Sequence, residues 1–81
     1  MKISEQIIEE VETFMELSSL SFDSIDLDTN LMKDLKLSET HIKSIIDNIE
    51  FRCEVSLKKS NICKQYKTIE DIYNQVCSEW A

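Results

Sequence analysis

Side chains able to support acid–base, nucleophilic or metal chemistry are few in this sequence and form no recognisable set. The single histidine, His41, stands apart from the three cysteines, Cys53, Cys63 and Cys77, and no two cysteines form a Cys-x-x-Cys pair. Zinc sites require such short spacings, so no metal site is predicted. His41 with Cys53 would suggest a nucleophile and its base, but Cys53 falls on the apolar face of a helical pattern and is predicted to be core. The sequence therefore indicates a protein that is not an enzyme.

Carboxylates are concentrated in residues 1–30, where eight acidic residues stand against one lysine, and the whole chain has a net charge of −7. An acidic surface of this kind repels phosphate backbones, so nucleic acid is not an expected partner. One stretch has oxygen ligands at short spacing, as a calcium loop does, but it lacks the turn glycine and the closing glutamate of such a loop. No calcium site is therefore predicted at Asp23, Asp26, Asp28 and Asn30.

The composition predicts one all-α domain spanning residues 1–81. Hydrophobic residues make up 42% of the 81 positions and charged residues 31%, and the chain contains neither glycine nor proline. Tight hairpin turns depend on glycine, so helices joined by polar loops are favoured over a β-sheet fold, with asparagine, serine and aspartate at the turns. With no long apolar run, neither a signal peptide nor a membrane span is expected. We expect a cytoplasmic monomer whose cysteines are buried, reduced thiols.

Helical periodicity places the elements that would position any functional side chain. Apolar residues at helical spacing predict a first helix from about Ser4 to Leu17, and a connection over residues 18–37 whose apolar residues pack on the core. Ser38 is a predicted N-cap, and the second helix follows it. Its apolar face is formed by Ile42, Ile45, Ile46, Ile49 and Cys53.

The C-terminal part of the pattern is shorter and more irregular. Residues 54–57 alternate apolar and polar residues, but with no partner strand they are predicted to be an extended linker. A short helical turn is expected near residues 60–64, capped by Ser60. Thr68 is predicted to cap the last helix. Its apolar face would comprise Ile69, Ile72, Tyr73, Val76 and Trp80.

Three stretches in this order resemble the acyl carrier protein family and the related peptidyl carrier domains. They are Ile25 with Asn30-Leu31-Met32-Lys33-Asp34-Leu35, then Ile45-Ile46-Asp47-Asn48-Ile49-Glu50 leading to Cys53-Glu54-Val55-Ser56-Leu57, and Lys67-Thr68-Ile69-Glu70-Asp71-Ile72. Together they span nearly the whole chain. The resemblance implies a four-helix bundle with a long first loop and a short third helix.

The resemblance also implies a function, which is to hold an acyl or aminoacyl group as a thioester on a 4′-phosphopantetheine arm. In the family a serine four positions after the leucine of Asp-Leu bears the arm, but Glu39 occupies that position here. Ser38, one residue earlier, is the candidate attachment site, and Ser44 is a weaker candidate. Two interpretations of Ser38 stay open, a plain helix cap and an arm-bearing serine. Residues expected to shelter the cargo are Ile42, Ile46 and Ile49.

The family's partners imply where other proteins would bind. Acyl-transferring, ligase or synthase enzymes, and a phosphopantetheinyl transferase, would meet the second helix near Lys43 and Phe51. That surface is nearly neutral in this sequence, so electrostatic steering of partners should be weak. The alternative hypothesis keeps the fold without the arm, so that the protein is an interaction module docking a partner through Lys43 and Phe51.

Overall fold

Four helices follow one another in the computed structural model, which describes residues 2–57 and 60–80. They are α1 (Ile3–Leu17), α2 (Glu39–Cys53), α3 (Ile62–Gln65) and α4 (Ile69–Trp80). Within these residues there is no strand, and the only β-type pairing is an isolated bridge between Asn30 and Thr68. The predicted all-α fold, with a long first connection and a short third helix, is confirmed.

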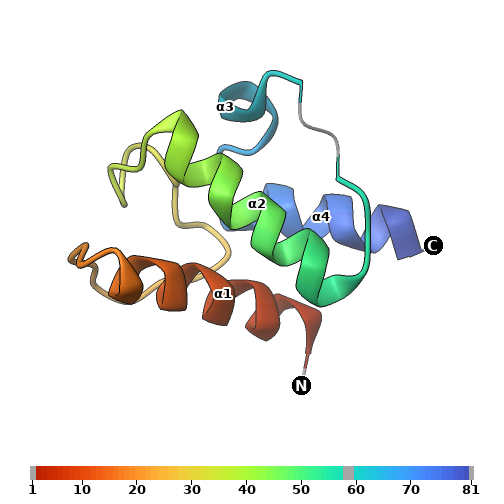
Figure 1. Cartoon of the computed structure of the whole chain (residues 1–81), viewed down its shortest axis with the longest axis horizontal. Coiled ribbons are helices and arrows are strands. Elements are labelled where there is room, and N and C mark those ends of the chain that lie inside the picture. Colours follow the sequence, from red (N-terminus) through yellow and green to blue (C-terminus); the bar gives the residue numbers. More distant parts are fainter. Residues whose placement is uncertain (1, 58–59, 81) are drawn as a thin grey trace.

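The helices pack against one another (Figure 1). The first helix, α1, contacts both α2 and α4, while α2 also contacts α3. In the view of Figure 1, α2 crosses in front of α4, and α1 runs below both of them. The C-terminal ends of α2 and α4 lie on the same side of the molecule as the start of α1. The first connection therefore occupies the opposite side, where it leads into the start of α2.

Helix α2 owes its position to its apolar face. The isoleucines at 42, 45, 46 and 49 are all fully buried, and Cys53 continues the same face. On α1 the buried residues recur every four positions, at Ile7, Val11 and Met15. Both patterns place one helical stripe against the core and leave the polar residues outside. The remaining buried residues are Ile25, Leu31, Leu35, Leu37, Leu57, Ile62, Tyr66, Ile69, Ile72 and Val76.

The long connection between α1 and α2 is held against the start of α4 by backbone hydrogen bonds. The N–H of Leu31 donates to the carbonyl of Lys67 at 2.8 Å, and the N–H of Ile69 donates to the carbonyl of Thr29 at 3.2 Å. Leu31 is fully buried, and Ile25 and Leu35 are 9% exposed. The prediction that this connection packs on the core is confirmed.

Turns in this glycine-free chain require other residues to adopt the left-handed conformation. Ser19, Lys36, Glu54 and Asn61 have φ between 54° and 57°. Serine and asparagine were expected at such positions, whereas Lys36 and Glu54 were not. Glu54 ends α2, and its N–H donates to the carbonyl of Glu50. A β-carbon in this region costs roughly 1–2 kcal/mol, so packing on either side must hold these turns.

Several predicted boundaries are corrected. Helix α1 begins at Ile3, after Lys2, and not at Ser4. Helix α3 begins after Asn61, whose side chain makes no cap hydrogen bond, so the Ser60 cap is wrong. Thr68 does cap α4, since its Oγ1 accepts from the N–H of Asp71 at 3.3 Å while the Asp71 carboxylate accepts from the N–H of Thr68 at 3.1 Å.

The cysteines are less uniform than expected. Cys53 is buried, but Cys63 and Cys77 are only partly covered, so the prediction of three buried thiols is wrong for two of them. The side chain of Trp80, expected on the apolar face of α4, lies outside the described residues. Across the described part of the chain, no helix combines the length and apolar character that a bilayer span requires.

Candidate functional site

Ser38 stands directly before the first residue of α2 and is exposed. Its backbone is extended, with φ −85° and ψ 169°, and its Oγ accepts a hydrogen bond from the N–H of His41 at 3.3 Å. This is the geometry of an N-cap, which satisfies one of the otherwise unpaired donors of the first helical turn. The predicted cap is confirmed, and the same geometry leaves the Ser38 side chain at the surface.

His41 completes the cap from the other direction. Its Nδ1 accepts a hydrogen bond from the N–H of Ser38 at 3.3 Å, which makes a reciprocal capping box. Glutamate or glutamine usually fills this third helical position, because the side chain must offer an acceptor. The imidazole also packs edge-on against the ring of Phe14, with centroids 5.8 Å apart. His41 is half-buried and joins α1 to the start of α2.

The His41 cap leads to a first testable prediction. His41→Ala removes the acceptor for the Ser38 N–H and should lower the free energy of unfolding by about 0.5–1.5 kcal/mol. His41→Gln offers a replacement acceptor and should lose less. Urea denaturation followed by circular dichroism measures both variants. Equal losses in the two variants would show that the contact with Phe14, and not the hydrogen bond, is what His41 contributes.

The residues on either side of Ser38 fix its place at the edge of the bundle. Leu37 is 3% exposed, and its N–H donates to the carbonyl of Leu31 at 3.0 Å. Glu39 is the exposed first residue of α2. A carboxylate there interacts favourably with the positive end of the helix dipole, typically by about 0.3–1 kcal/mol. Glu39 therefore has a structural reason to be acidic.

The residues expected to shelter a cargo are packed tightly under the site. Ile42, Ile46 and Ile49 are each 0% exposed and belong to the continuous core cluster. Protein interiors pack at crystal-like density, so an acyl chain among these side chains would require them to move apart. The weaker candidate, Ser44, lies inside α2 and is half-buried. Of the two serines, Ser38 is therefore the more accessible.

Two residues expected to meet a partner lie on the exposed side of α2. Lys43 is exposed, and Phe51 is an exposed large hydrophobic residue at 83%. Eight helical positions separate them, which corresponds to about 12 Å along the helix axis. The two side chains therefore do not form one compact patch.

Glu50, the residue before Phe51, makes hydrogen bonds within the fold. Its Oε2 accepts a hydrogen bond from the N–H of Leu57 at 2.7 Å, and its backbone carbonyl accepts from the N–H of Val55 at 3.3 Å. Glu50 thus joins the end of α2 to the extended linker that follows. The sequence did not predict this contact, because a hydrogen bond spanning seven residues leaves no periodic signal.

A second prediction concerns this contact. Glu50→Ala leaves the Leu57 N–H without its charged acceptor and should lower the free energy of unfolding by roughly 1–3 kcal/mol. Glu50→Gln keeps an oxygen acceptor and should retain part of that stability. Thermal and urea denaturation of the two variants provide the measurement. A Glu50→Ala variant as stable as the unmodified chain would contradict this assignment.

The Asp26 carboxylate and the Asn30 amide oxygen in the first connection also have structural partners. Oδ1 of Asp26 accepts from the N–H of Asp28 at 2.9 Å and from the Thr29 hydroxyl at 3.3 Å. Oδ1 of Asn30 accepts from the N–H groups of Met32 and Lys33 at 3.0 and 2.8 Å. In the described ranges, no three histidine, cysteine, aspartate or glutamate residues are placed to hold a metal ion. These oxygens stabilise turns.

Comparison with known proteins adds no family to this description. No protein-family model, curated protein or solved structure matches this chain. Its function is therefore inferred from its own residues and from the geometry around Ser38.

Proposed function

We propose that the protein is a carrier that presents a covalently tethered acyl or aminoacyl group to partner enzymes and itself catalyses nothing. The tether would be 4′-phosphopantetheine, attached through a phosphodiester to Oγ of Ser38, with the cargo held as a thioester on the terminal thiol. The observation that supports this proposal most is that Ser38, the residue directly before α2, is exposed. A modifying enzyme needs such a hydroxyl at the surface.

The start of α2 is chemically suited to a phosphate. Backbone N–H groups at a helix N-terminus, together with the helix dipole, favour a negative group. α2 is 15 residues long, so its dipole is fully developed. The Glu39 carboxylate would repel the negative charge of a phosphate on Ser38. Because Glu39 is exposed, water and salt weaken that repulsion. An ester oxygen at Ser38 also remains able to accept from the N–H of His41.

The chain itself would contribute only the Ser38 hydroxyl to the modification step, with coenzyme A as the co-substrate and the phosphopantetheinyl transferase as the catalyst. Oγ would form a bond to the phosphorus that bears the pantetheine, and the bond from that phosphorus to the bridging oxygen of coenzyme A would break. Adenosine 3′,5′-bisphosphate leaves, and the hydroxyl proton passes to a base of the phosphopantetheinyl transferase. Oγ accepts, and does not donate, in its contact with the His41 N–H, so its own hydrogen is free to be removed.

An intact-mass experiment tests the proposal. The protein would be incubated with coenzyme A and each of several phosphopantetheinyl transferases, and its mass recorded before and after. We expect a gain of one phosphopantetheine group in the unmodified chain and in Ser44→Ala, but none in Ser38→Ala. Ser38→Ala removes the helix cap and should lower the free energy of unfolding by about 0.5–2 kcal/mol. The variant should therefore remain folded, and circular dichroism checks this. A gain that persists in folded Ser38→Ala would refute the assignment.

A second function is favoured by one observation, the 83% exposure of Phe51 on α2. An exposed aromatic side chain is a frequent anchor in protein interfaces. In this proposal the fold serves as an interaction module that docks a partner through Phe51 and Lys43, and Ser38 acts only as a helix cap. The mass experiment separates the two proposals, because a chain that no transferase modifies would support the interaction module.

A further inference from the structure

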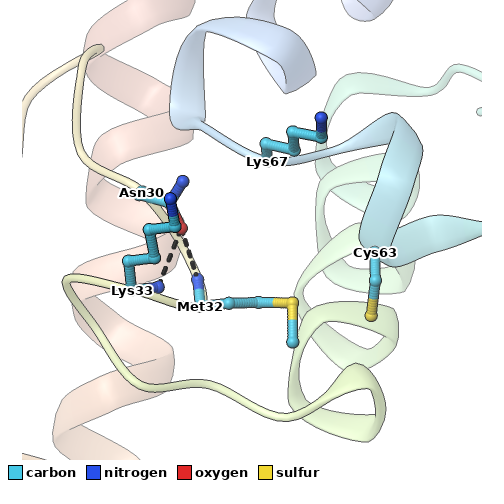
Figure 2. A pocket seen from close by; sticks show the side chains of 5 residues that line it. All are labelled: Asn30, Met32, Lys33, Cys63 and Lys67. Atoms are coloured by element: carbon cyan, nitrogen blue, oxygen red, sulfur yellow. Dashed lines mark hydrogen bonds between the residues drawn. The ribbon is translucent and has the colours of Figure 1, made fainter.

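A pocket of about 240 Å³ lies between the first connection and the segment containing α3, and we name it the loop–α3 pocket. It is lined by Asn30, Met32, Lys33, Cys63 and Lys67. Figure 2 shows Met32 reaching from the connection toward α3, with the Cys63 thiol on the opposite side. The volume is below the range of roughly 300–1,000 Å³ that suits drug-sized ligands, so any ligand must be small.

The floor of this pocket is apolar and polarizable. Met32 is 43% exposed although it is a large hydrophobic residue, and Cys63 is only partly covered. Thioether and thiol groups adapt to irregular apolar ligands, because methionine has several rotatable bonds and both sulfur atoms are polarizable. Because the Met32 side chain is partly exposed, an apolar group entering the pocket would remove more of it from water.

Two lysines also line the pocket, and Figure 2 shows their ammonium groups away from the sulfur atoms of Met32 and Cys63. Lys33 approaches from the connection and Lys67 from the segment before α4. Among the described residues, neither lysine forms an ion pair. The chain as a whole is acidic, but at physiological ionic strength charges beyond about 8 Å are largely screened. The carboxylates of Asp34 and Asp71 accept hydrogen bonds from the nearby N–H groups of Asn30 and Lys67 but do not line the pocket. The charged residues that line it are the two lysines, so the pocket lining favours an anionic ligand over a cationic one.

The backbone that presents these side chains is already fixed. Oδ1 of Asn30 accepts hydrogen bonds from the N–H groups of Met32 and Lys33. The N–H of Leu31 donates to the carbonyl of Lys67 at 2.8 Å. The N–H of Lys67 in turn donates to the Asp71 carboxylate at 2.9 Å. These contacts join the two sides of the pocket, so a ligand would not have to order them. Such preorganisation lowers the entropic cost of binding.

We propose that the loop–α3 pocket binds a small organic anion, a carboxylate or phosphate on a short apolar chain. The anionic group pairs with Lys33 and Lys67, while the chain covers the sulfur atoms of Met32 and Cys63. This proposal does not depend on a tether at Ser38. It concerns a free ligand bound without covalent chemistry, and it applies equally to Ser38→Ala.

Protection of Cys63 from alkylation tests the proposal. The protein would be treated with neutral iodoacetamide alone and with hexanoate, hexyl phosphate or hexan-1-ol, and alkylation of each cysteine followed by peptide mass spectrometry. Cys77 is partly covered like Cys63 but does not line the pocket, so it is the internal reference. Burial and the nearby Glu10 carboxylate raise the pKa of the Cys53 thiol, so that residue should react slowest throughout.

We expect each anion to slow alkylation of Cys63 but not of Cys77, by about tenfold at ten times the dissociation constant. The anion that slows alkylation of Cys63 more at equal concentration carries the preferred headgroup. Lys33→Gln and Lys67→Gln should each weaken binding about two- to fivefold, as loss of one exposed ion pair does. Lys2→Gln removes the same charge at the start of α1 and should change nothing.

A second measurement detects a ligand that binds the pocket without protecting the Cys63 thiol. The methyl resonance of Met32 should shift with added hexanoate, whereas that of the fully buried Met15 should not. Equal effects of hexan-1-ol and hexanoate would overturn the anionic specificity. No protection of Cys63 and no shift of Met32 with either anion at millimolar concentration would overturn the site.

Discussion

Ile49→Ala should lower the free energy of unfolding by about 2–5 kcal/mol. The side chain is 0% exposed and sits in the middle of the apolar face of α2, within the core cluster shared by all four helices. Truncation removes buried methyl groups and leaves a cavity that the surrounding side chains only partly fill. A domain of this size has a total stability of about 4–12 kcal/mol, so the loss is a large share of it.

Asn48→Ala is the matched control for this prediction. Asn48 precedes Ile49 on the same helix but is exposed, so its truncation should change the stability by no more than about 0.5 kcal/mol. Urea denaturation at one temperature, followed by helical circular dichroism, compares the two variants. An Ile49→Ala variant that loses less than the control would mean that α2 does not present this face to the core.

Tyr66→Ala should be at least as damaging, with a loss of roughly 3–5 kcal/mol. Tyr66 follows α3, is fully buried, and is among the largest of the fully buried side chains. Its N–H donates to the carbonyl of Ile62 at 2.9 Å, so the residue both ends α3 and fills the core beneath it. Removing the ring should therefore destabilise α3 and the adjoining start of α4.

Tyr66→Phe separates the ring from the hydroxyl. Because the ring stays in the core, this variant should lose only about 0.5–1.5 kcal/mol, the usual net contribution of one hydrogen bond. Amide hydrogen exchange of α3 and α4 would locate the effect along the chain. If Tyr66→Phe lost as much stability as Tyr66→Ala, the claim that Tyr66 stabilises the fold mainly through burial of its ring would be wrong.

Periodicity predicted the parts of the fold that depend on long, regular apolar stripes. The isoleucines of α2 and the spacing on α1 placed both helices, because a stripe repeating every three or four residues can be buried only as a helix. Ser38 and Thr68 were predicted as caps because a hydroxyl before an apolar run satisfies the first N–H groups. Both hydroxyls make that contact.

Short elements and turns were harder to predict. Helix α3 has four residues, too few for a periodic pattern, and its start after Asn61 was missed. Tyr66 was not predicted to be core, because a lone aromatic residue between polar neighbours gives no sign of its burial. The left-handed conformations of Lys36 and Glu54 follow from the packing on both sides of each turn, and their side chains do not favour them.

The functional surroundings of Ser38 were predicted only in part. The sequence placed the serine at the start of α2, but not the reciprocal bond from His41, whose acceptor nitrogen at the third helical position was the available signal. The loop–α3 pocket joins residues 30–33 to Cys63 and Lys67, more than 25 positions away in the sequence. Contacts of that range depend on the tertiary fold, so no local pattern could have revealed them.

Capping and carrying are compatible roles for Ser38, because the cap uses an acceptor lone pair of Oγ and the tether would replace only its hydrogen. The tripeptide region Leu37-Ser38-Glu39 therefore needs no rearrangement to accept a tether. What distinguishes the two roles is a covalent bond, which can be observed directly.

Peptide mapping after the transferase reaction is the most direct test. Trypsin cleaves after Lys36, Lys43 and Arg52, which places Ser38 in the peptide of residues 37–43 and Ser44 in the peptide of residues 44–52. We predict that the phosphopantetheine mass appears on the first peptide, and that fragmentation assigns it to Ser38 and not to Thr40. Its appearance on the second peptide, or on neither with every transferase tried, would contradict the assignment of Ser38 as the attachment site.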